Sequence, residues 1–143
     1  MGITLLLTAL GCLVGFIFGF AIAAIRSTKA LSLLPLRLLV TVYVEIFRRI
    51  PFLVTLFIVM FSIQVLSRNI SLFTIAVISI CLLSTAFLSE IIRAGMESVP
   101  RQQVEAAETL NFGFWRTQLR VILPQSWKVI IPPAFAFMVM FIK

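Results

Sequence analysis

The stretch ITLLLTALGCLVGFIFGFAIAAI, residues 3–25, contains no charged side chain. A helix that crosses the hydrocarbon core of a bilayer needs about 20 mostly apolar residues. We therefore predict that this stretch is a membrane-spanning helix. The alternative of a secretory signal peptide is disfavoured, because the apolar run is too long and no basic residues precede it.

Three further apolar stretches extend this prediction to a protein that crosses the membrane several times. They are residues 43–66, 70–89 and 127–142, the last of which carries Pro132-Pro133 near its start and is short for a full span. The composition agrees, since 62% of the residues are hydrophobic and 12% are charged, whereas soluble domains are about half apolar and about a quarter charged. The expected fold is an all-α bundle of transmembrane helices in one domain, residues 1–143. We expect it to stop after the start of its fourth helix.

The basic residues are concentrated on one side of the predicted membrane. Ten of them fall between the first and second spans or after the third: Arg26, Lys29, Arg37, Arg48, Arg49, Arg93, Arg101, Arg116, Arg120 and Lys128. Only Arg68 and Lys143 fall on the other side. The positive-inside rule then predicts that the N-terminus lies outside and that residues 90–128 lie in the cytoplasm. The charges form no single stripe, so we expect membrane lipid and not nucleic acid as a partner.

Small residues recur every four positions along the first span, at Gly11, Gly15, Gly19 and Ala23. This spacing places them on one face of a helix. Small side chains allow another helix backbone to approach closely in lipid, so we predict that this face packs against a second helix. Glycine is also commoner in membrane helices in general, which leaves an interpretation without packing open.

The polar segment of residues 95–125 is too long for a simple turn and predicts two helices joined by a turn. Pro100 suits the first turn of a helix, and residues 102–110 are mostly good helix formers. Asn111 is expected to close that helix in the left-handed conformation. A second helix over residues 114–123 would end at the proline that follows.

Two features of this polar segment suggest a contact surface. Ala106 and Ala107 would leave the backbone of the first helix nearly bare, so that a partner could come close. Phe112, Phe114 and Trp115 add large apolar groups near the turn. These aromatic side chains suit either a partner's groove or the lipid interface.

Three motifs, in order along the chain, carry a likeness to a known family: Tyr43-Val44-Glu45-Ile46-Phe47-Arg48 with Pro51, Glu90-Ile91-Ile92-Arg93-Ala94-Gly95 with Ser98-Val99-Pro100, and Glu105-Ala106-Ala107 continued by Leu110, Asn111 and Ile122-Leu123-Pro124-Gln125. The third motif resembles the EAA signature of the permease subunits of ATP-binding cassette (ABC) importers. The first two are similar to sequences found in the polar amino-acid uptake subfamily. The usual Gly of the EAA loop is Asn111 here, and Asn can also adopt the left-handed conformation.

This resemblance implies a fold of the type I importer permeases, a multi-pass location in the bacterial inner membrane, and transport of amino acids. It implies two ATPase subunits, a second permease subunit, identical or different, and an extracytoplasmic substrate-binding protein as partners. The residues expected at the ATPase are Glu105, Ala106, Ala107, Leu110, Asn111 and Pro124. Members of the family continue into a fifth helix, so the chain is expected to be a fragment or an incomplete gene product.

The residues also bear on rival functions. The sequence has no GxxxxGK[ST] loop, no Asp and no His, so we expect no ATP hydrolysis, no bound metal or cofactor and no hydrolase triad in this chain. Ion-coupled carriers commonly carry an ionisable residue inside the membrane. Here Glu45, Arg48, Arg49 and Glu90 lie at the cytoplasmic ends of the spans. For the first three, both anchoring at headgroup level and gating of the cytoplasmic mouth are open. A carrier or channel, a non-transporting scaffold, and an amphipathic connector at residues 105–110 remain the alternatives.

Overall fold

The computed structural model describes residues 2–28, 31–66 and 70–142, and every regular element in these ranges is a helix. The elements are α1 (Gly2–Ser27), a 3₁₀ turn η1 (Leu31–Leu33), α2 (Leu34–Arg49), α3 (Phe52–Leu66), α4 (Leu72–Glu97), α5 (Arg101–Thr109), α6 (Phe114–Thr117), a π-helical turn η2 (Gln118–Ile122) and α7 (Leu123–Ile142). The all-α prediction is confirmed. Three charges used to orient the chain, Lys29, Arg68 and Lys143, lie outside the described residues.

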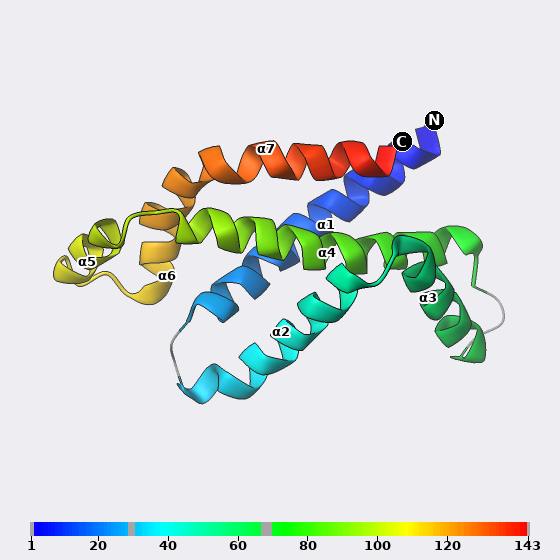
Figure 1. Ribbon diagram of the computed structural model, residues 1–143, viewed down its shortest axis with the longest axis horizontal. Helices are drawn as coiled ribbons and strands as arrows, with labels where there is room; N and C mark the ends of the chain where they lie inside the picture. Colours follow the sequence, from blue (N-terminus) through cyan, green and yellow to red (C-terminus); the bar gives the residue numbers. More distant parts are fainter. Residues whose placement is uncertain (1, 29–30, 67–69, 143) are drawn as a thin grey trace.

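The central element is α4, which runs along the length of the molecule (Figure 1). Helix α1 crosses it and makes the most extensive contact with it, and α7 and α2 also pack on it. The short helices α5 and α6 lie at one end of the molecule, away from the start of α1 and the end of α7 (Figure 1). The polar segment and the first residues of α1 are therefore at opposite ends.

Three helices of the described chain are long and apolar enough to cross a membrane: Gly2–Ser27, Leu72–Glu97 and the continuous run Phe114–Met140. Helices α2 and α3 pass the same test only as a pair, and they are bent by 118° at their junction. Counting that pair as one span gives four. Both numbers describe a bundle that crosses the membrane several times.

The junction of α2 and α3 differs from the predicted stretch of residues 43–66, which reads as one apolar segment. Pro51 has no backbone N–H to continue the helix. The residue before a proline is pushed into extended conformation, and Ile50 has φ −87° and ψ 130°. The chain therefore leaves α2 at Arg49 and restarts as α3 at Phe52, in a new direction.

The prediction that a helix ends at Pro124 is wrong. The helix that begins at Phe114 continues through this proline into α7. A π-helical turn precedes the proline, and the Leu123 amide donates to the Gln118 carbonyl, five residues earlier. Such a wide turn moves the preceding carbonyl groups away from the proline ring, with which they would otherwise clash. Pro132 and Pro133 likewise lie inside α7.

The small-residue stripe of α1 faces α4. A Cβ atom added to Gly15 would lie 2.8 Å from the Cβ of Ser84, and one added to Gly19 would lie 2.9 Å from the backbone nitrogen of Ser89. Real Cβ atoms do not approach so closely. Gly11 is equally restricted by Ile80, and Ala23, the last member, is fully buried. The two helix backbones thus meet at a distance that only small residues on α1 permit.

Candidate functional site

The predicted contact segment forms α5, and the structure separates its two alanines. Ala106 is exposed, whereas Ala107 is 3% exposed and turned toward the rest of the protein. Val104 lies on the same inner side and packs against the core cluster that contains Val99 and Ile122. The bare surface predicted for both alanines is therefore provided by Ala106, while Ala107 lets α5 lie close to its own protein.

The turn after α5 is closed as predicted by Asn111, whose φ is 56°. The Asn111 amide donates to the Glu108 carbonyl at 2.9 Å, and the Phe112 amide donates to the Ala107 carbonyl at 3.0 Å. This pair of hydrogen bonds is the Schellman arrangement that satisfies the last carbonyl groups of a helix. Helix α5 consequently ends in a defined geometry although it has only nine residues.

The outer side of α5 and its turn is open. The Glu105 side chain is exposed and makes no hydrogen bond or ion pair with any residue that the structure describes. Leu110 is 70% exposed, so it adds an apolar side chain to this outer side. Phe114 and Trp115 pack edge to face, 5.5 Å apart, and both are exposed. This surface has the mixed apolar and polar character of a contact surface.

The inner side of α5 is connected to the long helices. The side-chain amide of Gln125, in the first turn of α7, donates to the Gln103 side chain on α5 at 3.4 Å. Helix α5 also packs on the π-helical turn, where Gln118 is 5% exposed. Pro124 is exposed at the beginning of α7 and not on α5. Helix α5 is therefore linked to α7 by this hydrogen bond and, through the π-helical turn, by packing.

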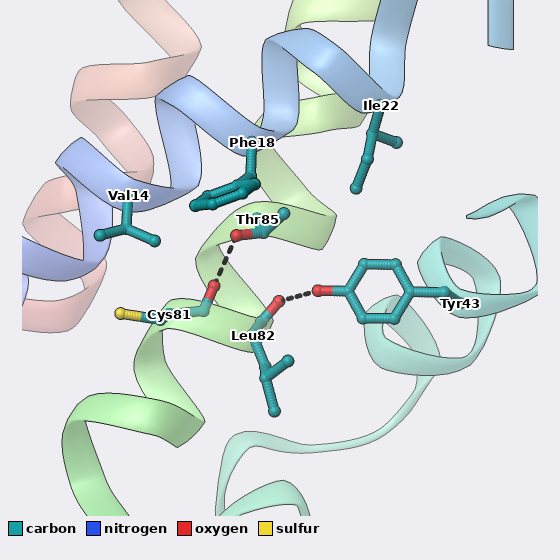
Figure 2. A pocket seen from close by; sticks show the side chains of 7 residues that line it. All are labelled: Val14, Phe18, Ile22, Tyr43, Cys81, Leu82 and Thr85. Carbon is teal, nitrogen blue, oxygen red and sulfur yellow. Dashed lines mark hydrogen bonds between the residues drawn. The ribbon is translucent and has the colours of Figure 1, made fainter. Parts of the chain in front are cut away.

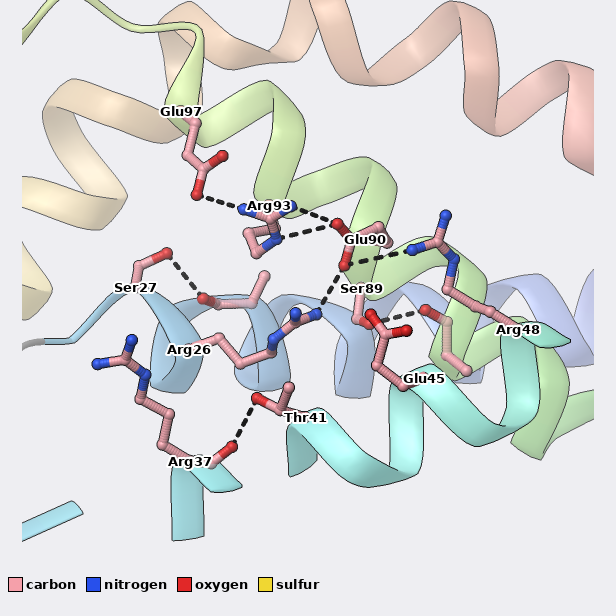
Figure 3. Close-up of polar contacts among 12 residues, drawn as sticks. Arg26, Ser27, Arg37, Thr41, Glu45, Arg48, Ser89, Glu90, Arg93 and Glu97 are labelled. Carbon is pink, nitrogen blue, oxygen red and sulfur yellow. Dashed lines mark hydrogen bonds and ion pairs between the residues drawn. The ribbon is translucent and has the colours of Figure 1, made fainter. Parts of the chain in front are cut away.

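A second polar group, which the sequence analysis did not foresee, surrounds Glu90 near the end of α4. Its carboxylate accepts from Arg26 of α1 at 2.6 Å and lies 3.8 Å from Arg48 of α2. Arg93 forms an ion pair with the same Glu90 carboxylate and a second ion pair with Glu97 (Figure 3). One carboxylate thus joins three helices. Sequence spacing gives no signal for a pair 64 residues apart.

The other charged side chains of α2 contact residues that are close to them in the sequence. Glu45 accepts from Arg49, one helical turn away, at 3.1 Å, and both side chains are largely exposed. Arg37 donates to the Thr28 carbonyl at 3.4 Å. The structure therefore gives the residues at the end of α2 different partners, since Arg48 reaches α4 whereas Arg49 stays on its own helix.

An apolar groove lies between α1, α2 and α4, with a volume of about 300 Å³. Its lining consists of Val14, Phe18, Ile22, Tyr43, Cys81, Leu82 and Thr85 (Figure 2). The Tyr43 hydroxyl donates to the Leu82 carbonyl at 2.6 Å, and the Thr85 hydroxyl donates to the Cys81 carbonyl at 2.7 Å. Both hydroxyl groups thus use their protons on the backbone of α4, and the wall of the groove is apolar.

These features together define a class of protein: a polytopic helical membrane protein with a short, exposed helix inserted before its last long helix. The sequence comparison then gives the family. The chain belongs to the family described as "Binding-protein-dependent transport system inner membrane component", which it matches over residues 11–143. Membership of this family and the several apolar helices place it in the inner membrane as a multi-pass protein.

Relatives and a solved structure agree with this family. The chain is 35% identical to the probable glutamine ABC transporter permease protein GlnM of Bacillus subtilis, over 91% of its own length and 59% of that protein. It is 41% identical to the L-cystine transport system permease protein TcyB of the same organism, over 85% and 52%. The fold superimposes with a TM-score of 0.84 on a structure described as "Crystal structure of an amino acid ABC transporter with histidines". That match has 31% identity and covers 99% of this chain and 65% of the other.

The chain therefore spans little more than half the length of the curated relatives it matches. The matched part includes the exposed helix α5, the Glu90 group and the groove, because it covers residues 11–143.

Proposed function

We propose that this chain supplies the membrane-spanning part of an ABC importer permease that moves amino acids across the bacterial inner membrane. The family and the two relatives support transport, and the names of those relatives refer to glutamine and L-cystine. Free amino acids are therefore the substrate class. The permease works with two ATPase subunits, a second permease subunit and an extracytoplasmic substrate-binding protein.

The observation that carries this proposal is the geometry of α5. Its outer side, with Glu105, Ala106 and Leu110, is exposed, and its turn is fixed by Asn111. Its inner side is packed on the helices that cross the membrane. A subunit that binds the outer side can thus act on the long helices without entering the membrane.

The mechanism follows from these contacts. Closure of the ATPase pair on nucleotide pushes α5, and the push reaches α7 through the Gln103–Gln125 hydrogen bond and through Val104 against the core. Since Gly95 of α4 packs directly on Ile130 of α7, α4 moves with α7. Tilting of these two helices exchanges access between the two sides of the membrane.

The proposed orientation places the start of α1 outside the cell and α5 in the cytoplasm. The two lie at opposite ends of the molecule (Figure 1). Arg101, Arg116 and Arg120 lie on α5, α6 and the π-helical turn, at the end opposite the start of α1, in keeping with the positive-inside rule. An ATPase that uses cytoplasmic nucleotide requires this orientation.

The test is to replace Ala106, which is exposed on α5, by Trp and to measure both ATPase co-purification and amino-acid uptake in cells. We expect at least a tenfold loss of both, because a bulky side chain at the closest point of approach keeps the two surfaces apart. Ala136→Trp is the matched control, since Ala136 is exposed on α7 and away from α5. Full co-purification and uptake with Ala106→Trp would disprove the docking role.

A second measurement separates docking from orientation. A cysteine introduced by Glu105→Cys, in a background where Cys12 and Cys81 are replaced by Ala, is labelled with a membrane-impermeant maleimide. We expect labelling of inverted vesicles and none of intact cells. Labelling of intact cells would place α5 outside and would exclude an ATPase at this surface. Ala107 is unsuitable for either test, because its burial means that a large side chain would displace α5 itself.

A further inference from the structure

The apolar groove and the arginine group around Glu90 are formed by the same three helices, α1, α2 and α4. Ile22 lines the groove on α1, and Arg26 follows it by one helical turn. Tyr43 closes the groove on α2, and Arg48 comes later on the same helix. Thr85 lines it on α4, and Glu90 follows. Figure 2 shows the groove and Figure 3 the arginine group, which is called the charged rim below, and both are formed by the same three helices.

The groove is open on one side, and exposed apolar side chains lie around the opening. Phe18 on its edge is 59% exposed, and Val42 and Ile46 of α2 are also exposed. The Tyr43 and Thr85 hydroxyl groups donate to backbone carbonyls and offer no proton to a ligand. Water requires two to four polar partners in such a space, and the wall does not provide them. The occupant that suits this wall is a flexible hydrocarbon chain.

The charged rim has an excess of positive charge. Arg26, Arg48 and Arg93 contact two carboxylates, Glu90 and Glu97, which leaves a net charge of +1 from three positive and two negative groups. The local pair of Glu45 and Arg49 adds one charge of each sign. An anionic group is therefore electrostatically complementary to this rim.

Arg48 is the member with donor capacity to spare. Its guanidinium lies 3.8 Å from Glu90, beyond good hydrogen-bond distance, and its side chain is 39% exposed. A guanidinium carries five N–H donors and binds phosphate oxygens in pairs. By contrast, Arg93 is engaged on both sides by Glu90 and Glu97.

We propose that this surface is a binding site for an anionic phospholipid, with one acyl chain in the groove and the phosphate of the headgroup on Arg48. Basic pockets between transmembrane helices are known to hold acidic lipid headgroups in this way. The lipid fills the space between α1, α2 and α4 and ties α2 to the bundle. The proposed lipid site does not include α5, so lipid binding there does not require transport activity.

The two halves of the site have different roles. An acyl chain gains no hydrophobic free energy when it moves from the bilayer to an apolar groove, because lipid tails are as apolar as the groove. The choice among lipids therefore depends on the headgroup and on the arginines. The groove controls only whether any chain fits.

The experiment measures lipid binding to the purified chain by native mass spectrometry, with phosphatidylglycerol and phosphatidylcholine of identical acyl chains. We expect the wild-type protein to bind phosphatidylglycerol on the order of tenfold more tightly. Arg48→Gln should reduce this preference about fivefold, which corresponds to the roughly 1 kcal/mol that each basic residue contributes. Arg120→Gln, on the π-helical turn and outside the groove, is the matched charge control and should change it little.

A second pair of variants tests the groove. Val14→Phe fills it from α1 and should weaken the binding of both lipids severalfold. Ile17→Phe places the same side chain on an exposed position of α1 that does not line the groove, and should leave binding unchanged. Circular dichroism checks that each variant keeps its helix content.

Three results would overturn the proposal. The first is equal binding of the two lipids by the wild-type protein, a comparison that needs no variant. The second is competition by glycerol phosphate without acyl chains, which would reveal a site for a soluble anion. The third is a photoreactive group at Phe18 that crosslinks to a protein chain and not to lipid, since the groove would then be filled by a helix or a second copy.

Discussion

Helices α1 and α2 both pack on α4, but they do so by different means. Along α1 the contact is made by Gly11, Gly15 and Gly19, which bring the two backbones together. Along α2 the described polar links to α4 are single side-chain contacts, namely Tyr43 with the Leu82 carbonyl and Arg48 with Glu90. The groove of about 300 Å³ lies on the side of α2. The α1 contact is set by close backbone packing, whereas α2 is held by the fully buried Val44 and a few polar links.

The difference shows which part of the bundle is able to move. A seam built on close packing has little freedom, because a small displacement loses many contacts at once or produces overlap. Ser84 lies fully buried at this seam, and its hydroxyl has no partner among the described residues, so the α1 contact does not depend on hydrogen bonds there. A helix held by individual polar links can shift when one link is exchanged. We therefore regard α1 and α4 as one rigid unit and α2 as the adjustable one.

The largest expected effect is on the α1 seam. Gly15→Leu should destabilise the protein by about 3 kcal/mol, at the upper end of the usual cost of overpacking, because its Cβ would lie 2.9 Å from the backbone carbon of Ser84. The measurement is an unfolding titration with SDS in mixed micelles. Gly2→Ala is the control in the same helix, where nothing lies within 4 Å of the added atom. A loss of stability as small as that of the control would show that the helices separate easily.

A smaller effect is expected at Glu90 of α4, whose carboxylate contacts both Arg26 of α1 and Arg48 of α2. Glu90→Gln should cost about 2 kcal/mol, less than the loss of a fully buried pair, because the amide retains one acceptor for Arg26 and the site is partly exposed. The control is Glu45→Gln, whose pair with Arg49 is exposed and should contribute less than about 0.5 kcal/mol. The same titration measures both. Equal effects of the two variants would remove the distinction between the shared carboxylate and a surface ion pair.

The smallest effect is expected on the α2 contact. Tyr43→Phe removes only the hydroxyl that donates to the Leu82 carbonyl, and hydrogen bonds between membrane helices contribute about 0.6 kcal/mol on average. Thr41→Val is the control, since the Thr41 hydroxyl donates within α2 to the Arg37 carbonyl. A cost of Tyr43→Phe near that of Gly15→Leu would mean that α2 is as firmly fixed as α1.

Much of the architecture could be predicted from the sequence, because it depends on local properties of the chain. Uncharged stretches of sufficient length predict helices in lipid, and the run of residues 3–25 corresponds to α1. Asn111 was expected in the left-handed conformation, and its φ of 56° confirms it. Both depend on residues close together in the sequence.

The features that could not be predicted depend on contacts or on backbone geometry around prolines. Hydropathy counts apolar residues and does not detect a missing amide, so residues 43–66 read as one segment although Pro51 divides them. The opposite error occurred at Pro124, where a π-helical turn allowed the helix to continue. The burial of Ala107 required knowledge of where α5 lies, and the Arg26–Glu90 pair joins residues from different helices.

The corner at Ile50 and Pro51 has a consequence for the bilayer itself. Pro51 provides no amide proton, so the last turn of α2 has one donor fewer than an unbroken helix, and a carbonyl left without a partner is costly in hydrocarbon. Arg48 and Arg49 stand directly before this corner, and charged side chains draw water toward them and thin the bilayer locally. The membrane surface should therefore dip toward the corner, so that the hydrocarbon core of the bilayer is thinner beside α2 than beside α1.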